Sequence, residues 1–251
     1  MADFTIEIAG HTAAVSSLFA SSKDYCRDYL TDKPPEIFIR VTEEDLRFEQ
    51  QSLDEEAIEE GFRLRVFSAP FLDRAAIQRK MADYLLTHQV LMTHGSAIAV
   101  DGLGYLFTAK SGTGKSTHTR FWRETFGSRA AMINDDKPFL SIGQEKILIC
   151  GAPWSGKHGL HSNTTVPLAG ICILARGSEN RIQKITAEEA LPMLLHQCHQ
   201  PPQQEAYVRQ LVNTLATRIP LWHMTCTKEK QAASVAHNAM AGISISKEAF
   251  L

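Results

Sequence analysis

Hydrophobic and polar residues alternate in three short runs within the first 70 residues of the chain. Each run is bounded by glycine, proline or charged residues, and alternation with a period of two predicts strands that bury one face. The runs cover residues 4–8, 37–41 and 62–67. We therefore expect a small strand-rich region at the start of the chain, with a short helix near residues 15–29.

A helical pattern follows this region. Apolar residues at helical spacing predict a helix over residues 71–86, and they are Leu72, Ile77, Met81 and Leu85. The acidic stretch 43–60 favours a solvated loop or the exposed face of a helix over a binding tail.

The middle of the chain is more apolar. Residues 90–100 and 103–109 flank Asp101-Gly102, which predicts a hairpin of buried strands. A loop over 111–116, a helix ending at Phe126 and a strand over 130–134 come next. Further strands are expected at 147–149, 168–174 and 221–225, and helices at 187–199, 203–217 and 228–241.

Composition excludes several classes of protein. The 251 residues are 44% hydrophobic, and 26 basic against 28 acidic residues leave a net charge of −2, so nothing indicates binding to nucleic acid. No run approaches 18 apolar residues and the first residues lack a signal sequence, so we expect no membrane contact and a cytoplasmic location. Five cysteines without a C-x-x-C pair fit reduced thiols.

Residues 109–116 carry the phosphate-loop pattern, with Ala109 where the first glycine usually stands. Glycines let backbone N–H groups approach phosphate oxygens, and the following helix directs its dipole at the same anion. Lys115 is expected to reach the β- and γ-phosphates, and the Ser116 hydroxyl to bind Mg²⁺. The nucleotide-binding candidates are Ser111, Gly112, Thr113, Gly114, Lys115, Ser116 and Thr117.

Asp135 and Asp136 end the apolar run 131–133. Carboxylates at the end of a buried strand beside a phosphate loop suit a metal ligand and a catalytic base. Only one helix fits between Lys115 and this pair, which places the carboxylates close to the loop. The order of the two roles stays open, as does the simpler interpretation of a solvated turn.

Three further polar features each allow a functional and a simpler structural interpretation. The loop 151–163 holds Lys157, two histidines and a tryptophan that is expected to be exposed. It is either a lid over phosphates, with Lys157 neutralising charge, or a surface hairpin. Arg176 is a phosphate or acceptor contact, or a surface residue. The tract 196–199 resembles a metal site, but no second pair of ligands accompanies it.

Three ordered motifs resemble the phosphoenolpyruvate-carboxykinase-like superfamily, which includes ATP-dependent phosphoenolpyruvate carboxykinase and HPr kinase/phosphorylase. They are residues 93–97, 105–117 and 133–136, and the resemblance covers about residues 90–175. It implies an α/β fold, with a phosphate-loop core of mixed sheet flanked by helices over 89–251. Residues 1–88 would form a small strand-rich region packed on that core. It also implies that His94 lies near the transferred phosphate or the metal.

The resemblance predicts an ATP- and Mg²⁺-dependent kinase that uses Asp135, Asp136, His94, Lys115 and Lys157. The acceptor would be a hydroxyl on a protein, a peptide, free serine or a small metabolite. HPr kinases carry a Glu-x-Arg-Gly signature where this chain has Pro-Trp-Ser-Gly-Lys, and this departure counts against HPr as the substrate and against a phosphorylase activity. The alternatives are a carboxykinase-related enzyme and a nucleotide sensor without transfer. Analogy with the HPr kinases also predicts a homo-oligomer.

Overall fold

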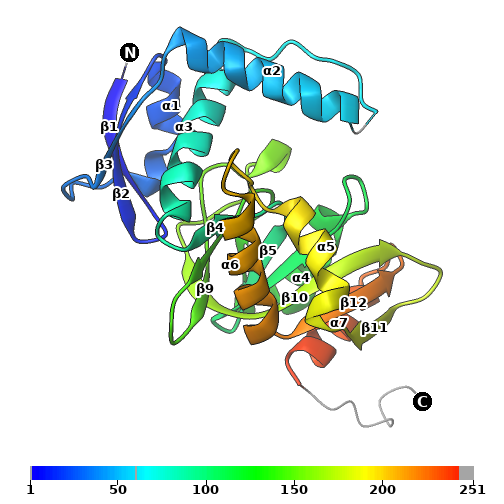
Figure 1. Cartoon of the computed structure of the whole chain (residues 1–251). Coiled ribbons are helices and arrows are strands. Elements are labelled where there is room, and N and C mark those ends of the chain that lie inside the picture. Colours follow the sequence, from blue (N-terminus) through cyan, green and yellow to red (C-terminus); the bar gives the residue numbers. More distant parts are fainter. Residues whose placement is uncertain (1, 60, 243–251) are drawn as a thin grey trace, which may run out of the picture. The chain divides into compact units, whose positions relative to one another are not determined.

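The computed structural model describes residues 2–59 and 61–242 (Figure 1). The chain divides into two compact units, residues 1–88 and residues 89–251. Both units combine helices with β-sheet, so the predicted mixed α/β class is confirmed. No helix in the part of the chain that the structure describes is long and apolar enough to cross a membrane.

The first unit is a three-stranded sheet covered by helices. Strands β1 (Ala2–Ile8) and β2 (His11–Ser17) form an antiparallel hairpin, and β3 (Ile37–Arg40) adds to β2 in parallel. The hairpin turns within two residues because Ala9 and Gly10 both take positive φ, 53° and 86°. Against the sheet pack α1 (Ala20–Tyr25) and α3 (Ala69–Leu86), and α2 (Glu43–Glu59) packs on α3; a 3₁₀ turn, η1, covers Arg27–Tyr29.

The structure confirms two of the three strands predicted in this unit. The third prediction was wrong, because residues 62–67 form no strand and pair with none among the described residues. Phe62, Leu64 and Val66 are 59%, 58% and 96% exposed. The Gln50 side chain holds this segment by accepting from Phe67 N and donating to Arg65 O.

The helices of this unit differ from the predictions at their ends. The acidic stretch is the helix α2, which buries only Leu46 and Glu49, so the prediction of an exposed helix face is confirmed; Glu60 lies outside the described residues. The helix predicted near 15–29 is shorter, because β2 continues to Ser17 and α1 begins at Ala20.

The second unit is built on a mixed sheet with the order β4-β8-β9-β10-β6-β5-β7, in which β12 also pairs with β10, and β11 with β12. Its long strand β10 pairs in antiparallel fashion with β9 at one end, and in parallel with β6 and β12 along the rest. The strands are β4 (Val90–Met92), β5 (Ser96–Val100), β6 (Leu103–Thr108), β7 (Ala130–Asn134), β8 (Phe139–Ile142), β9 (Ile147–Cys150), β10 (Thr165–Arg176), β11 (Arg181–Lys184) and β12 (Leu221–Cys226).

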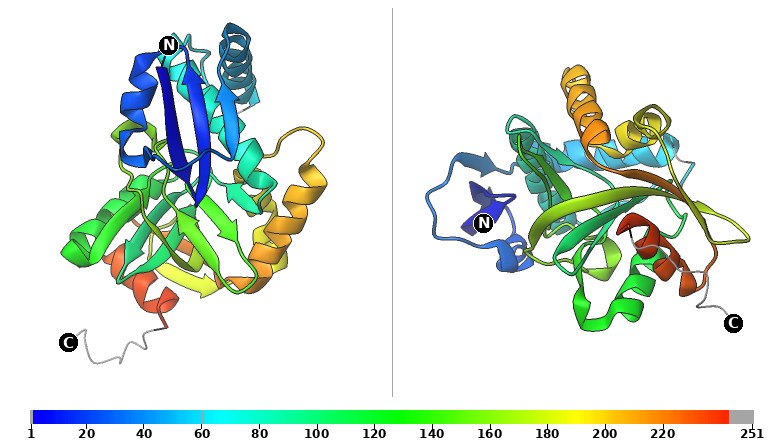
Figure 2. Two further views of the ribbon diagram at one scale, coloured as in Figure 1. Left: turned by 90° about the vertical axis from the view of Figure 1, so that its left-hand side faces the viewer. Right: turned by 90° about the horizontal axis from the view of Figure 1, so that it is seen from below.

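Two pairs of helices cover this sheet, one pair on each side (Figure 2). On one side lie α4 (Lys115–Phe126) and α7 (Gln231–Met240), and on the other α5 (Ala187–Gln197) and α6 (Glu205–Arg218). Two 3₁₀ turns are η2 (Gly127–Arg129) and η3 (Gly156–His158). The fully buried Trp122 of α4 contacts Tyr105 and Phe107 of β6, which fixes this helix on the sheet.

The structure confirms most elements predicted here and corrects one. The hairpin around Asp101 and Gly102 exists, but it comprises β5 and β6 only. Residues 90–92 form the separate strand β4, which pairs with β8. The sequence pattern missed the four-residue strands β8 and β11 because a run of that length shows too little periodicity.

Candidate active site

The phosphate-loop sequence lies between the end of β6 and the start of α4. Gly112 and Gly114 take φ of 72° and 120°, a backbone conformation that favours glycine. The Lys115 side chain is largely buried and folds back over the loop, where Nζ donates a hydrogen bond to Ala109 O at 3.1 Å. The glycines of the loop thus take conformations that other residues disfavour, the lysine closes back on the start of the loop, and phosphate binding stays a prediction.

Arg176, at the end of β10, holds this loop from one side. Its guanidinium donates hydrogen bonds to Gly112 O and, at 3.4 Å, to Thr113 O. Arg176 is thus an exposed residue that contacts the backbone of this loop, and its contact with a phosphate or an acceptor stays a prediction.

Two cavities meet at the loop and share Gly112, Thr113 and Arg176. The larger, of about 560 Å³, also reaches Lys110, Ser111 and His223. The smaller, of about 170 Å³, also reaches Gly114, Thr117 and Lys228. The loop thus borders open space with one lysine lining each cavity, and positive charge of this kind favours an anionic ligand.

Asp135 follows β7 and is only 8% exposed. Its Oδ1 accepts a hydrogen bond from Ser96 Oγ at 2.6 Å, and Ser96 Oγ lies 2.7 Å from Thr119 Oγ1. Because Ser96 has one hydroxyl proton and gives it to the carboxylate, Thr119 must donate to Ser96. Thr119 belongs to the first turns of α4, so this chain of hydrogen bonds ties Asp135 to the helix behind the phosphate loop.

Asp136 lies in a different environment. Its Oδ1 is 3.3 Å from His94 Nε2, and both side chains are 31% exposed. Burial, together with the charges of Lys137 and Lys115, lowers the pKa of His94 to about 3. With its pKa lowered this far, the ring is neutral at pH 7. A neutral imidazole can position the Asp136 carboxylate through Nε2–H without neutralising its charge.

The buried side chain of Asn134 connects the aspartate pair to the second polar loop. Its Oδ1 accepts from the backbone N–H groups of Asp136 and Lys137, at 2.8 and 2.7 Å. Its Nδ2 donates to Ala152 O and Trp154 O, at 2.7 and 3.1 Å. One amide therefore sets both the turn that carries the carboxylates and the path of the loop beside them.

The loop 151–163 lies directly against Asp136. A Cβ built on Gly156, which has φ of 69°, would be 3.2 Å from Asp136 Cβ. Lys157 is the next residue, in η3, and it is exposed. The expectation of an exposed Trp154 was wrong, because its ring is 5% exposed and packs edge-on against Phe139.

The tract 196–199 supports His94 from the other side. His94 N donates to Gln197 O at 2.7 Å, and Cys198 pairs with Thr93 in an isolated β-bridge. Burial raises the pKa of the Cys198 thiol to about 12, which leaves it protonated and a poor metal ligand. The observed role of the tract 196–199 is to hold the backbone of Thr93 and His94 through these hydrogen bonds.

The structure thus brings the predicted residues into one region of the second unit. The phosphate loop, the aspartate pair, His94 and the Lys157 loop are joined by the contacts above. Sequence reasoning did not single out Ser96, Thr119 and Asn134 as site residues. Ser96 and Asn134 lie within the motifs at 93–97 and 133–136, but they and Thr119 act through hydrogen bonds to residues 20 or more positions away, which no local pattern records.

Comparisons with known proteins leave the family of this chain unassigned. No protein-family model matches it, and no curated protein matches it. Among solved structures, it is similar to the HPr(Ser) kinase/phosphatase from Coxiella burnetii, with a TM-score of 0.38 and 10% sequence identity. That likeness covers 61% of this chain and 97% of the other. A TM-score of this size carries no argument about activity, so the function must be argued from the geometry of the site.

Proposed function

We propose that this protein is an ATP- and Mg²⁺-dependent kinase that transfers a phosphoryl group to a hydroxyl. The observation that carries the proposal is the division of the aspartate pair between two environments. Asp135 is tied through Ser96 and Thr119 to the helix behind the phosphate loop, whereas Asp136 meets His94 and the loop of Lys157. Adjacent carboxylates with different neighbours suit two different roles.

Asp135 and the Ser116 hydroxyl are the proposed Mg²⁺ ligands. Both offer oxygen ligands, which this ion prefers, and Asp135 is linked through Ser96 to Thr119, which lies on α4 three residues after Ser116. When bound, Mg²⁺ supplies charge neutralisation at the phosphates. Backbone N–H groups of residues 111–114, the Lys115 ammonium and the N-terminus of α4 would hold the nucleotide.

Asp136 is the proposed base, because it is the more exposed carboxylate of the pair and lies against Gly156, the residue before the exposed Lys157. The acceptor oxygen would give its proton to Asp136 as it bonds to the γ-phosphorus, and the bond from that phosphorus to the ADP oxygen would break. Neutral His94 would keep the carboxylate oriented, and Lys157 would offset the charge that develops on the phosphoryl oxygens.

The test separates nucleotide binding from transfer. Purified protein with Mg²⁺ and labelled ATP is assayed for transfer to serine-bearing peptides and free serine, and for slow hydrolysis with water as acceptor. Asp136→Asn is expected to lower the rate at least about 100-fold while the Kd for ATP stays the same, because a base is lost and the phosphate loop is kept. Asp101→Asn, at an exposed turn, is the matched control.

Lys115→Ala tests the other half of the proposal. It removes the buried ammonium beside the loop and should weaken ATP binding itself. Normal ATP binding by this variant would contradict the phosphate-loop assignment. Tight ATP binding by the unmodified protein without any transfer would favour the nucleotide sensor, and full turnover in Asp136→Asn would refute the base assignment.

A further inference from the structure

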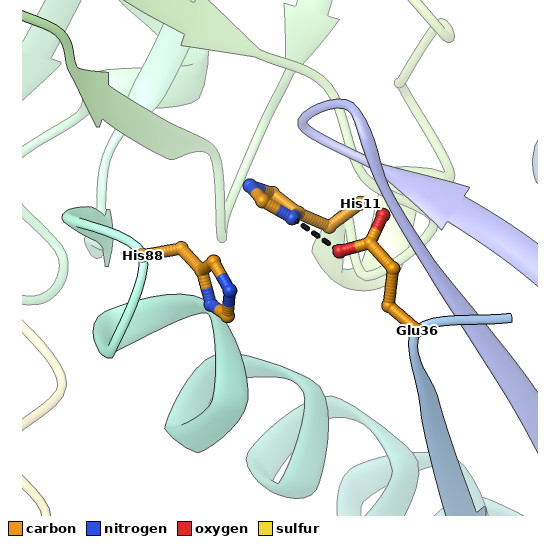
Figure 3. A group of neighbouring side chains, drawn as sticks. All are labelled: His11, Glu36 and His88. Atoms are coloured by element: carbon orange, nitrogen blue, oxygen red, sulfur yellow. Dashed lines mark hydrogen bonds and ion pairs between the residues drawn. The ribbon is translucent and has the colours of Figure 1, made fainter.

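A second cluster of ligand-type side chains lies in the first unit, apart from the residues of the proposed kinase site. His11, Glu36 and His88 each offer a potential ligand atom, and these atoms all lie within 4.8 Å of one another. Figure 3 shows His11 and Glu36 joined by a hydrogen bond, with His88 facing them from beyond the end of α3. No other such group occurs in residues 2–59 and 61–242.

From this arrangement, we propose that His11, Glu36 and His88 bind a divalent transition-metal ion of the Zn²⁺ class. Two imidazoles and one carboxylate are a ligand set that such ions prefer over Mg²⁺ or Ca²⁺. In a tetrahedral zinc site with bonds of about 2.0–2.2 Å, neighbouring ligand atoms are about 3.3 Å apart. His11 Nδ1 and Glu36 Oε2 are now 2.8 Å apart and share a hydrogen bond whose proton belongs to Nδ1. When an ion binds, that proton would move to Nε2 of the ring or to water, and side-chain movements of well under 1 Å would open room for the ion.

The hydrogen bonds around His88 leave one ring nitrogen ready to bind a metal. Thr87 Oγ1 donates its only proton to Tyr84 O at 2.7 Å. His88 Nδ1 faces both of these oxygens, at 3.0 and 3.2 Å, and both act as acceptors. Nδ1 must therefore carry the proton in the neutral ring, which leaves the lone pair of Nε2 free.

Hydrogen bonds hold the Glu36 carboxylate in place. Its Oε2 accepts from Tyr84 Oη at 2.9 Å as well as from His11, and its Oε1 accepts from Thr12 N at 3.3 Å. The carboxylate is therefore oriented before an ion arrives, which reduces the ordering that binding requires.

The backbone also fixes the three positions. His11 begins β2 immediately after the two-residue turn, and Glu36 N donates to Thr12 O at 3.0 Å. Pro34 and Pro35 restrict the segment that leads to Glu36. His88 follows the eighteen-residue helix α3. An ion held by all three would cross-link the hairpin, the entry to β3 and the end of α3.

Glu36 and His88 are exposed and His11 is half-buried, so solvent reaches the site. Three protein ligands leave one tetrahedral position for water or for another ligand. This site differs in kind from the proposed Mg²⁺ site, whose donors are all oxygens. The two sites can therefore be tested separately by the choice of ion.

The experiment is calorimetric titration of the full chain with Zn²⁺, without nucleotide and with excess Mg²⁺ to occupy the oxygen-donor site. We expect one Zn²⁺ per chain at the cluster. His88→Ala and His11→Gln should each weaken binding at least about ten-fold, because each removes one of three ligands. His196→Asn, in the histidine tract of the second unit, is the control and should bind as the unmodified protein does.

Zinc-edge X-ray absorption gives a second readout that does not depend on affinity. It should show imidazole ligands in the unmodified protein and fewer in His88→Ala. Undiminished binding by His88→Ala, absence of binding by the unmodified protein, or a loss of binding in His196→Asn would each overturn the proposal. None of these measurements involves phosphoryl transfer, so failure of this proposal and failure of the kinase proposal are distinguishable.

Discussion

Replacing Asn134 by alanine should both destabilise the second unit and displace the proposed base. The Asn134 side chain is fully buried and forms four hydrogen bonds to the backbone. A hydrogen bond contributes a net stabilisation of about 1 kcal/mol, and a buried group left without a partner costs at least as much. The four bonds together therefore predict a loss of about 4 kcal/mol from the free energy of unfolding.

Urea unfolding monitored by tryptophan fluorescence measures this loss of stability in the second unit. All three tryptophans, Trp122, Trp154 and Trp222, belong to residues 89–251. Thr214→Ala is a suitable control, because it removes one exposed hydroxyl that bonds within α6 and should change stability by less than about 0.5 kcal/mol. Protein that remains folded should bind ATP and fail to transfer phosphate.

The chemistry of the amide provides a sharper version of this test. Asn134→Asp keeps the shape of the side chain but turns an acceptor oxygen toward Ala152 O and Trp154 O, which are themselves acceptors. It should destabilise the unit at least as much as Asn134→Ala. A loss below about 1 kcal/mol in both variants would refute the reasoning, since four bonds of ordinary strength could not then exist.

Two further outcomes are expected in the second unit. Arg176→Ala should raise the Kd for ATP about five-fold, because it releases two carbonyls of the phosphate loop at a solvent-exposed contact. Arg218→Ala is the control. It releases Gly143 O and Gln144 O and should leave the Kd for ATP unchanged. Burial lowers the pKa of His118 to about 4, below the unfolded value of about 6.5, so the folded state binds fewer protons. The stability that this neutral ring contributes is complete above about pH 6.5 and is lost as the pH falls toward 4, by up to about 3 kcal/mol. In His118→Gln, whose amide oxygen can still accept from Trp122 Nε1, the dependence of urea unfolding on pH should be flatter over that range; an unchanged slope would contradict this assignment.

Local sequence patterns were sufficient for most elements of the fold. The spacing of Leu72, Ile77, Met81 and Leu85 predicted α3, and the Asp101-Gly102 turn predicted the hairpin of β5 and β6. Such elements depend on residues within a few positions of one another, so their signal is present in a short window. The phosphate-loop pattern is local in the same way, since Gly112, Gly114 and Lys115 act within one turn of the chain.

The wrong strand at 62–67 shows the limit of such patterns. Its alternating residues are typical of a strand, but a strand also needs a neighbour that supplies hydrogen bonds. In the structure the side chain of Gln50 occupies that role at Arg65 and Phe67. Whether a partner strand lies beside this segment depends on the rest of the fold, so it cannot be predicted from the six residues alone.

In the candidate sites, too, local sequence patterns predict some features, whereas others depend on contacts between distant residues. The paired carboxylates and the phosphate loop can be recognised from neighbouring residues, but the different environments of Asp135 and Asp136 arise from Ser96, His94 and Gly156. The ligands His11, Glu36 and His88 come from three segments with no common motif. Hydrogen bonding and metal coordination act over about 2–3 Å in space, whatever the separation along the chain, so these groups meet only when the chain folds.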